Sequence, residues 1–126
     1  MNTRTAGLII GIVFILVGIL GFIPNPLVSF IGLFVVNGAH NIVHLLSGIV
    51  ILAGVYSFGS ALGLKIIGVV YALVAILGLV MGGDMLLGMI AMNMADHWLH
   101  VVLAIVILAA GFALPDGGTS AARAAA

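Results

Sequence analysis

Four histidines are the residues of this 126-residue chain best suited to chemistry, and they lie in two segments of otherwise apolar sequence. His40 and His44 are four residues apart, as are Asp96 and His100, so each pair shares one face of a helix. Imidazole nitrogens and carboxylate oxygens bind zinc and other divalent metals. These four side chains are therefore a candidate metal site, whereas His97 points to another side of its helix.

The same spacing leaves other interpretations open. His44 and His100, predicted at equal depth on facing helices, could be the axial ligands of a haem, or one of them could bind a chlorophyll-type pigment. They could instead form a hydrogen-bonded structural pair. A group of methionines would favour copper(I), although methionine also serves as apolar filler: Met81, Met85, Met89, Met92 and Met94.

Asparagines precede the two helices that carry the histidines. Asn37 and Asn93 are predicted N-caps, because an asparagine oxygen accepts a backbone N–H bond at a helix start. Asp96 follows Asn93 by three residues, which approximates a capping box and suits the positive end of the helix dipole. The polar side chains are therefore expected in the first turns of both helices.

The composition is typical of an integral membrane protein, since 65% of the residues are hydrophobic and 5% are charged. A soluble domain carries about a quarter charged residues, and nucleic-acid binding needs a basic surface, which a net charge of +0 does not supply. Two short apolar runs, Leu27–Val36 and Met85–Met92, are predicted to be interfacial or re-entrant. Four stretches are long enough to cross a bilayer: Ala6–Ile23, Gly38–Phe58, Leu62–Met81 and Ala95–Leu114.

The basic residues predict the orientation. With four spans, Arg4, Lys65 and Arg123 all lie on the side of the termini, so the positive-inside rule places both termini in the cytoplasm. Residues 1–114 are expected to form a single transmembrane domain, and residues 115–126 a flexible cytoplasmic tail. The segments that carry the histidines then lie toward the outer side.

The sequence also contains an internal repeat. Residues 37–53 align with residues 93–109, and residues 11–21 with residues 68–78, so that His44 corresponds to His100 and His40 to Asp96. The predicted fold is all-α, a polytopic membrane four-helix bundle built from two tandem helix hairpins, residues 6–58 and 62–114. Both hairpins insert in the same direction, so a pseudo-two-fold axis is expected along the membrane normal.

The chain offers few residues for catalysis. It has no glutamate and no cysteine, no nucleophile beside a base, and no carboxylate in the middle of a span. We therefore expect a non-enzymatic protein, a structural or accessory subunit of a larger membrane complex, with protein partners or a second copy contacting its small-residue helix faces. The alternative is a membrane protein that binds a metal or tetrapyrrole at the histidine and aspartate cluster.

Two short motifs carry a resemblance. Asn-x-x-His-Asn-x-x-His and Asp-x-x-Leu-His resemble those of a family of small four-helix membrane proteins, common in actinobacteria and cyanobacteria, that is a domain of unknown function. The resemblance implies a four-helix fold in a bacterial inner or plasma membrane and carries no established activity. The family usually has asparagine where this chain has His97. The matching residues are Asn37, His40, Asn41, His44, Leu45, Gly48, Asn93, Asp96, Leu99 and His100, with Tyr71 in the third span.

Overall fold

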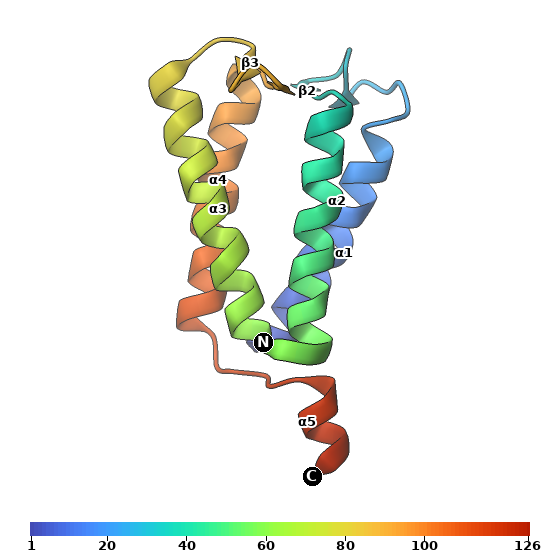
Figure 1. The fold of residues 1–126 in the computed structure, drawn as a ribbon, viewed down its shortest axis with the longest axis vertical. Helices are drawn as coiled ribbons and strands as arrows, with labels where there is room; N and C mark the ends of the chain where they lie inside the picture. Colours follow the sequence, from blue (N-terminus) through green and yellow to red (C-terminus); the bar gives the residue numbers. More distant parts are fainter.

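Four long helices form the protein (Figure 1). The computed structural model describes residues 1–126, apart from the side chains of residues 120 and 121. All four helices are long and apolar enough to cross a membrane, as the sequence predicted. They are α1 (Thr3–Leu20), α2 (Gly38–Ala53), which continues into the π-helical turn η1 (Gly54–Phe58), α3 (Ser60–Met81) and α4 (Met94–Ala113).

The first helix begins and ends three residues earlier than the apolar run predicted. Asn2 is its N-cap, and the Asn2 side chain accepts a hydrogen bond from the Thr5 backbone N–H at 2.9 Å. The helix ends at Leu20, although apolar residues continue as far as Ile23. Hydropathy alone misplaced both ends. The helix already begins after the polar cap Asn2, and the last apolar residues of the run lie in the loop that follows the helix.

The two shorter apolar runs each form a pair of two-residue strands rather than a helix. In the first connection β1 (Val28–Ser29) pairs in parallel with β2 (Phe34–Val35). In the second, β3 (Met85–Leu86) pairs antiparallel with β4 (Ile90–Ala91). The strands lie at the end of the bundle away from the termini (Figure 1). Both connections therefore cover one end of the bundle.

The helices associate as two close pairs. α1 packs along α2 and α3 packs along α4, whereas α1 and α4 make few contacts. Glycines permit the close approach, since a Cβ added to Gly48 would lie 2.8 Å from the carbonyl oxygen of Gly11. The shared core includes Phe14, Ile51 and Tyr71. Large apolar side chains on the outward faces are exposed, as a lipid environment requires: Ile9, Leu16, Ile49, Leu73 and Ile105.

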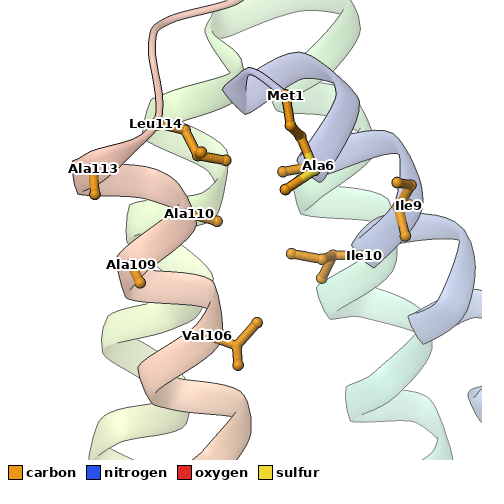
Figure 2. A pocket seen from close by; sticks show the side chains of 9 residues that line it. All are labelled: Met1, Ala6, Ile9, Ile10, Val106, Ala109, Ala110, Ala113 and Leu114. Carbon is orange, nitrogen blue, oxygen red and sulfur yellow. The ribbon is translucent and has the colours of Figure 1, made fainter.

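A cavity of about 460 Å³ lies between α1 and α4 near the end that carries the termini (Figure 2). Its wall is apolar, with Ile9 and Ile10 on α1 facing Val106 and Ala110 on α4. Among the side chains that the structure describes, those that line this cavity include no ionisable group. It reflects the loose contact between the two helix pairs on this side of the bundle.

The C-terminal segment returns to the helix starts. The Thr3 backbone N–H donates to the carbonyl of Pro115 at 3.0 Å, and the Ser60 hydroxyl donates to the carbonyl of Gly118 at 2.8 Å. A short helix follows, α5 (Ser120–Ala125). The beginning of the segment expected to be a flexible tail is thus hydrogen-bonded to the bundle.

Candidate metal centre

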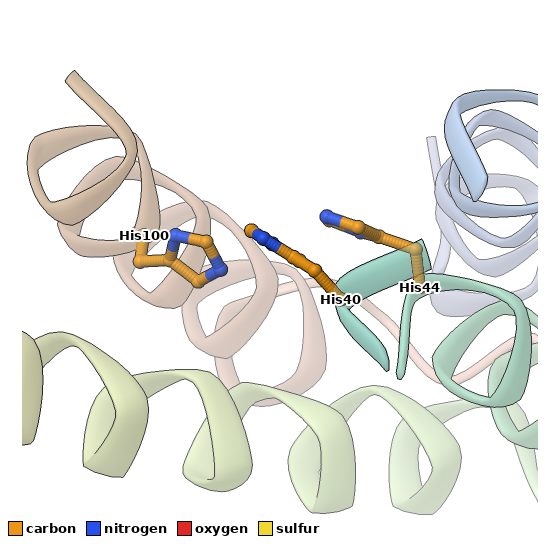
Figure 3. A group of neighbouring side chains, drawn as sticks. All are labelled: His40, His44 and His100. Carbon is orange, nitrogen blue, oxygen red and sulfur yellow. The ribbon is translucent and has the colours of Figure 1, made fainter. Parts of the chain in front are cut away.

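Three histidines meet inside the bundle, near the strand-bearing end. His40 and His44 lie in the first two turns of α2, and His100 lies in the second turn of α4 (Figure 3). One ring nitrogen of each lies within 4.8 Å of the other two. All three side chains are buried, with exposed fractions of 1%, 6% and 3%. We call this group the histidine triad.

Two members of the triad are oriented by backbone carbonyl groups. Nδ1 of His40 lies 2.7 Å from the carbonyl oxygen of Ala91, and Nδ1 of His100 lies 2.7 Å from that of Asp96. A carbonyl oxygen only accepts, so in both rings Nδ1 carries the proton and Nε2 keeps its lone pair. Nε2 of His40 is buried and has no hydrogen-bond partner. Such an unpartnered acceptor is a ready metal ligand.

A chain of hydroxyl groups orients the third member. Nδ1 of His44 lies 3.4 Å from the Tyr71 hydroxyl, which lies 3.3 Å from the Ser47 hydroxyl, and Ser47 donates to the Val43 carbonyl at 2.7 Å. Because Ser47 has one proton, all three contacts are hydrogen bonds only when His44 donates to Tyr71 and Tyr71 donates to Ser47. His44 then also presents an unprotonated Nε2.

Two aromatic rings that contact each other pack against the triad. The Tyr71 ring stacks on His100 with centroids 5.3 Å apart, and the Phe14 ring lies 5.4 Å from His44. Tetrahedral zinc at about 2.0–2.1 Å from each nitrogen needs the nitrogens roughly 3.3 Å apart. The three rings would therefore have to approach one another by about 1.5 Å at most.

The fourth predicted metal ligand, Asp96, lies outside this group. Among the residues that the structure describes, the cluster with metal-ligand spacing that includes these histidines has no carboxylate. The Asp96 carboxylate instead accepts the Asn93 backbone N–H at 3.3 Å, while Asn93 Oδ1 accepts the Asp96 N–H at 3.0 Å, which completes a capping box. Of the two roles that the sequence suggested for Asp96, capping box and metal ligand, the structure places its carboxylate in the capping box.

The two capping asparagines also join the connections to each other. Asn37 caps α2 through the His40 N–H and donates through Nδ2 to the Met89 carbonyl at 2.8 Å. Asn93 caps α4 and donates through Nδ2 to the Leu33 carbonyl, also at 2.8 Å. The start of each of these helices is thereby hydrogen-bonded to the connection of the other hairpin. These bonds fix the ends of the helices that carry the triad.

His97 and the methionines lie apart from the triad. His97 is buried against α3, where a Cβ added to Gly78 would overlap its ring, and its Nε2 lies 3.2 Å from the Gly83 carbonyl. Met92 is buried, whereas the other methionines of the predicted copper group are exposed, namely Met81, Met85, Met89 and Met94. Exposed methionines on an apolar connection fit the filler interpretation.

The space between His44 and His100 does not suit a haem. Their ring centroids are 6.2 Å apart, but His40 stacks on His44 at 4.8 Å and approaches His100 at 5.5 Å. Tyr71 covers another side of His100. A macrocycle would have to displace these buried rings, whereas a single ion needs only their nitrogens. The geometry favours a metal ion over a tetrapyrrole.

Sequence reasoning gave no site role to Ser47, or to Tyr71, which it named only as a match to the family. Both lie in the middle of apolar helices and are buried. Their signal in the sequence is a hydroxyl in the interior of a span, since a buried polar group needs a hydrogen-bond partner. The Ala91 and Asp96 carbonyls have no such signal, because any residue supplies a backbone oxygen.

Comparison with known proteins gives one match. The model of a family described as a domain of unknown function (DUF4383) matches residues 4–113, which is most of the chain. None of the curated proteins and none of the solved structures compared with the chain matches it.

Proposed function

The chain belongs to the DUF4383 family, and we propose that it is a membrane protein that binds one divalent transition-metal ion, zinc foremost, on His40, His44 and His100. The observation that carries this proposal is the convergence of three buried ring nitrogens within 4.8 Å. Imidazole nitrogen is a favoured ligand of zinc, copper, iron and nickel. The role is one of binding rather than enzymatic turnover.

The hydrogen bonds around the triad support this function. Metal-ligating histidines almost always donate their second ring N–H to a carbonyl or another fixed group, which sets the tautomer and the ring orientation. His40 and His100 have carbonyl partners, and His44 has the Tyr71 hydroxyl. Nε2 of His40 has no hydrogen-bond partner, so no other contact occupies the nitrogen that would bind the metal.

The metal content of the purified protein tests the proposal. We expect about one zinc per chain after loading and removal of free metal, and loss of nearly all of it in the double variant His44→Ala/His100→Ala. His97→Gln is the matched control, because His97 is equally buried on α4 but lies outside the triad. Asp96→Asn is expected to keep the metal. Equal zinc content in the double variant and the wild type would refute the proposal.

We also propose that the protein is a duplicated hairpin, with the triad shared between the two copies. Equivalent helix contacts support this. In the first pair, a Cβ added to Gly11 would lie 2.8 Å from Leu52; in the second, a Cβ added to Gly68 would lie 2.7 Å from Leu108. Leu52 and Leu108 are equivalent in the aligned segments, as are Gly11 and Gly68.

The residues around the triad and at the helix caps also correspond between the two hairpins. Phe14 contacts His44 in one hairpin as Tyr71 contacts His100 in the other. At the repeat offset of 56 residues, Asn37 corresponds to Asn93 and Leu33 to Met89. The bond from Asn37 to Met89 is therefore the equivalent of the bond from Asn93 to Leu33. These reciprocal contacts support a pseudo-two-fold axis between the hairpins, parallel to the helices.

We propose that both termini lie in the cytoplasm of a bacterial inner or plasma membrane. Arg4 lies in the first turn of α1, Lys65 in the second turn of α3, and Arg123 on α5. The beginnings of α1 and α3 and the short helix α5 all lie at the end of the bundle that carries the termini (Figure 1). By the positive-inside rule this end faces the cytoplasm, so the triad lies toward the outer side.

A structural or accessory role in a larger membrane complex stays a prediction. The exposed apolar helix faces are its support, since they would accept either lipid or a neighbouring helix. Extraction in mild detergent tests it. Partners recovered in fixed ratio to the chain would favour this role, and migration as a lone chain would count against it.

A further inference from the structure

A second cavity adjoins the histidine triad. It has a volume of about 230 Å³ and lies between α1, the first connection and α4. His44, a member of the triad, forms part of its wall, beside Phe14. Asp96 is the other ionisable residue of the wall, and the remaining lining is apolar. The cavity thus brings an apolar space to the edge of the candidate metal centre.

The triad leaves a coordination position to fill. Zinc sites that bind exogenous molecules have three protein ligands and an open fourth position, whereas structural sites have four protein ligands. In the part of the chain that the structure describes, no fourth histidine, cysteine or acidic residue joins the three. A doubly charged ion on three neutral imidazoles in an apolar interior is costly unless an oxygen or nitrogen donor completes its shell.

Exposed apolar residues form part of the cavity wall. Val13 on α1 and Leu27 in the first connection are 48% and 51% exposed. α1 and α4 make few contacts, so little packing closes this side of the bundle. A ligand that reaches the cavity from here must be lipid-soluble.

Resting on the proposed metal site, we infer that the cavity binds a lipid-soluble molecule with a single six-membered ring and one oxygen donor, which occupies the fourth position on the metal. An apolar protein cavity of roughly 150 Å³ accepts benzene, so 230 Å³ accommodates a substituted ring. The apolar wall matches the ring, and His44 and Asp96 mark the side where the donor lies. A phenol-type molecule meets these requirements.

Cobalt(II) makes the inference testable, because its visible absorption reports the ligands in the zinc position. The full chain is loaded with cobalt(II) in lipid nanodiscs and titrated with phenol as the probe. We expect a saturable change of the cobalt bands in the wild type. Leu103→Phe, which fills the cavity from α4, is expected to weaken the response at least tenfold, and Val17→Phe does the same from α1.

Val106→Phe is the matched control, since it adds the same side chain to the other cavity on the same helix. Its response is expected to equal that of the wild type. Histidine-dependent cobalt bands that phenol leaves unchanged would overturn this inference and leave the metal site standing. The same holds if both cavity-filling variants respond to phenol as strongly as the wild type. Absence of histidine-dependent cobalt bands would refute the metal site, and this inference with it.

Discussion

Tyr71 is the side chain that links the most parts of the candidate centre. Its ring stacks on His100, and its hydroxyl lies between His44 and Ser47. It therefore touches two of the three proposed ligands through different atoms. In the proposed metal site Tyr71 would be a positioning residue, because its hydroxyl accepts a hydrogen bond from Nδ1 of His44 and leaves Nε2 for the metal.

Replacing Tyr71 with phenylalanine separates these two contacts. The ring stack survives in Tyr71→Phe, but the His44 ring loses its partner, so we expect zinc to bind about 10- to 100-fold more weakly. Competition with a colorimetric chelator measures this. Tyr56→Phe is the control, since Tyr56 is exposed. Unchanged zinc affinity in Tyr71→Phe would assign Tyr71 to packing alone.

Sequence spacing grouped three histidines that the structure brings together, and it left Asp96 with two possible roles, as a metal ligand and in a capping box. His40, His44 and His100 follow from helical periodicity and the repeat, and they do lie together. Asp96 has the same spacing, yet its carboxylate is used in the cap of α4. Spacing places a residue on a face of a helix and does not say which of two nearby partners its side chain contacts.

At the scale of elements, the asparagines that cap the starts of helices also hold the connections together. The oxygen of Asn37 caps α2 while its amide group donates to the second connection at Met89. Serine has the capping oxygen but is too short to reach that carbonyl, and alanine lacks both functions. Two substitutions therefore separate the cap from the contact between connections.

We expect Asn37→Ser to lower the free energy of unfolding by about 0.5–1.5 kcal/mol, the value of one lost hydrogen bond. Asn37→Ala is expected to lose a further 0.5–2 kcal/mol or so, because the cap is lost as well. Unfolding in mixed micelles with increasing denaturing detergent measures both. Asn2→Ser is a matched control at a cap remote from the connections. Equal stability of Asn37→Ser and the wild type would contradict the inter-connection role.

The helices were predictable from sequence, and the connections were not. A membrane span gives a strong signal, because about 20 apolar residues are needed to cross the bilayer. The β1–β2 pair depends on Asn25, whose Oδ1 accepts from the backbone N–H of Val28 at 2.8 Å and whose Nδ2 donates to the Val28 carbonyl at 2.6 Å. Bonds of this kind follow from three-dimensional placement and leave no periodic pattern in the sequence.

For the whole molecule, the arrangement predicts which end faces the cytoplasm. The chain has no cysteine, so single cysteines report accessibility without interference. In intact cells, we expect a membrane-impermeant thiol reagent to label Met89→Cys in the second connection and to leave Ala125→Cys in α5 unlabelled. The reason is that the basic residues lie at the same end of the bundle as α5, which the positive-inside rule places in the cytoplasm. Both positions are exposed in the structure.

Lysis of the cells supplies the control for this experiment. Both cysteines are expected to react once the membrane is permeable, which shows that Ala125→Cys is chemically competent. Labelling of Ala125→Cys but not Met89→Cys in intact cells would reverse the orientation and place the histidine triad toward the cytoplasm.

The contact between the two hairpins near Gly54 and Gly63 lies far from the histidines, and a small rotation there would move them. A Cβ added to Gly63 would lie 3.2 Å from the Cα of Gly54, so the two hairpins touch backbone to backbone at this point. His44 precedes Gly54 by ten residues, or about 15 Å of helix. A rotation of about 5° at this contact would therefore displace His44 by roughly 1.3 Å relative to His100. A close contact of two glycines at one end of the bundle therefore influences how far apart the histidine rings lie at the other end.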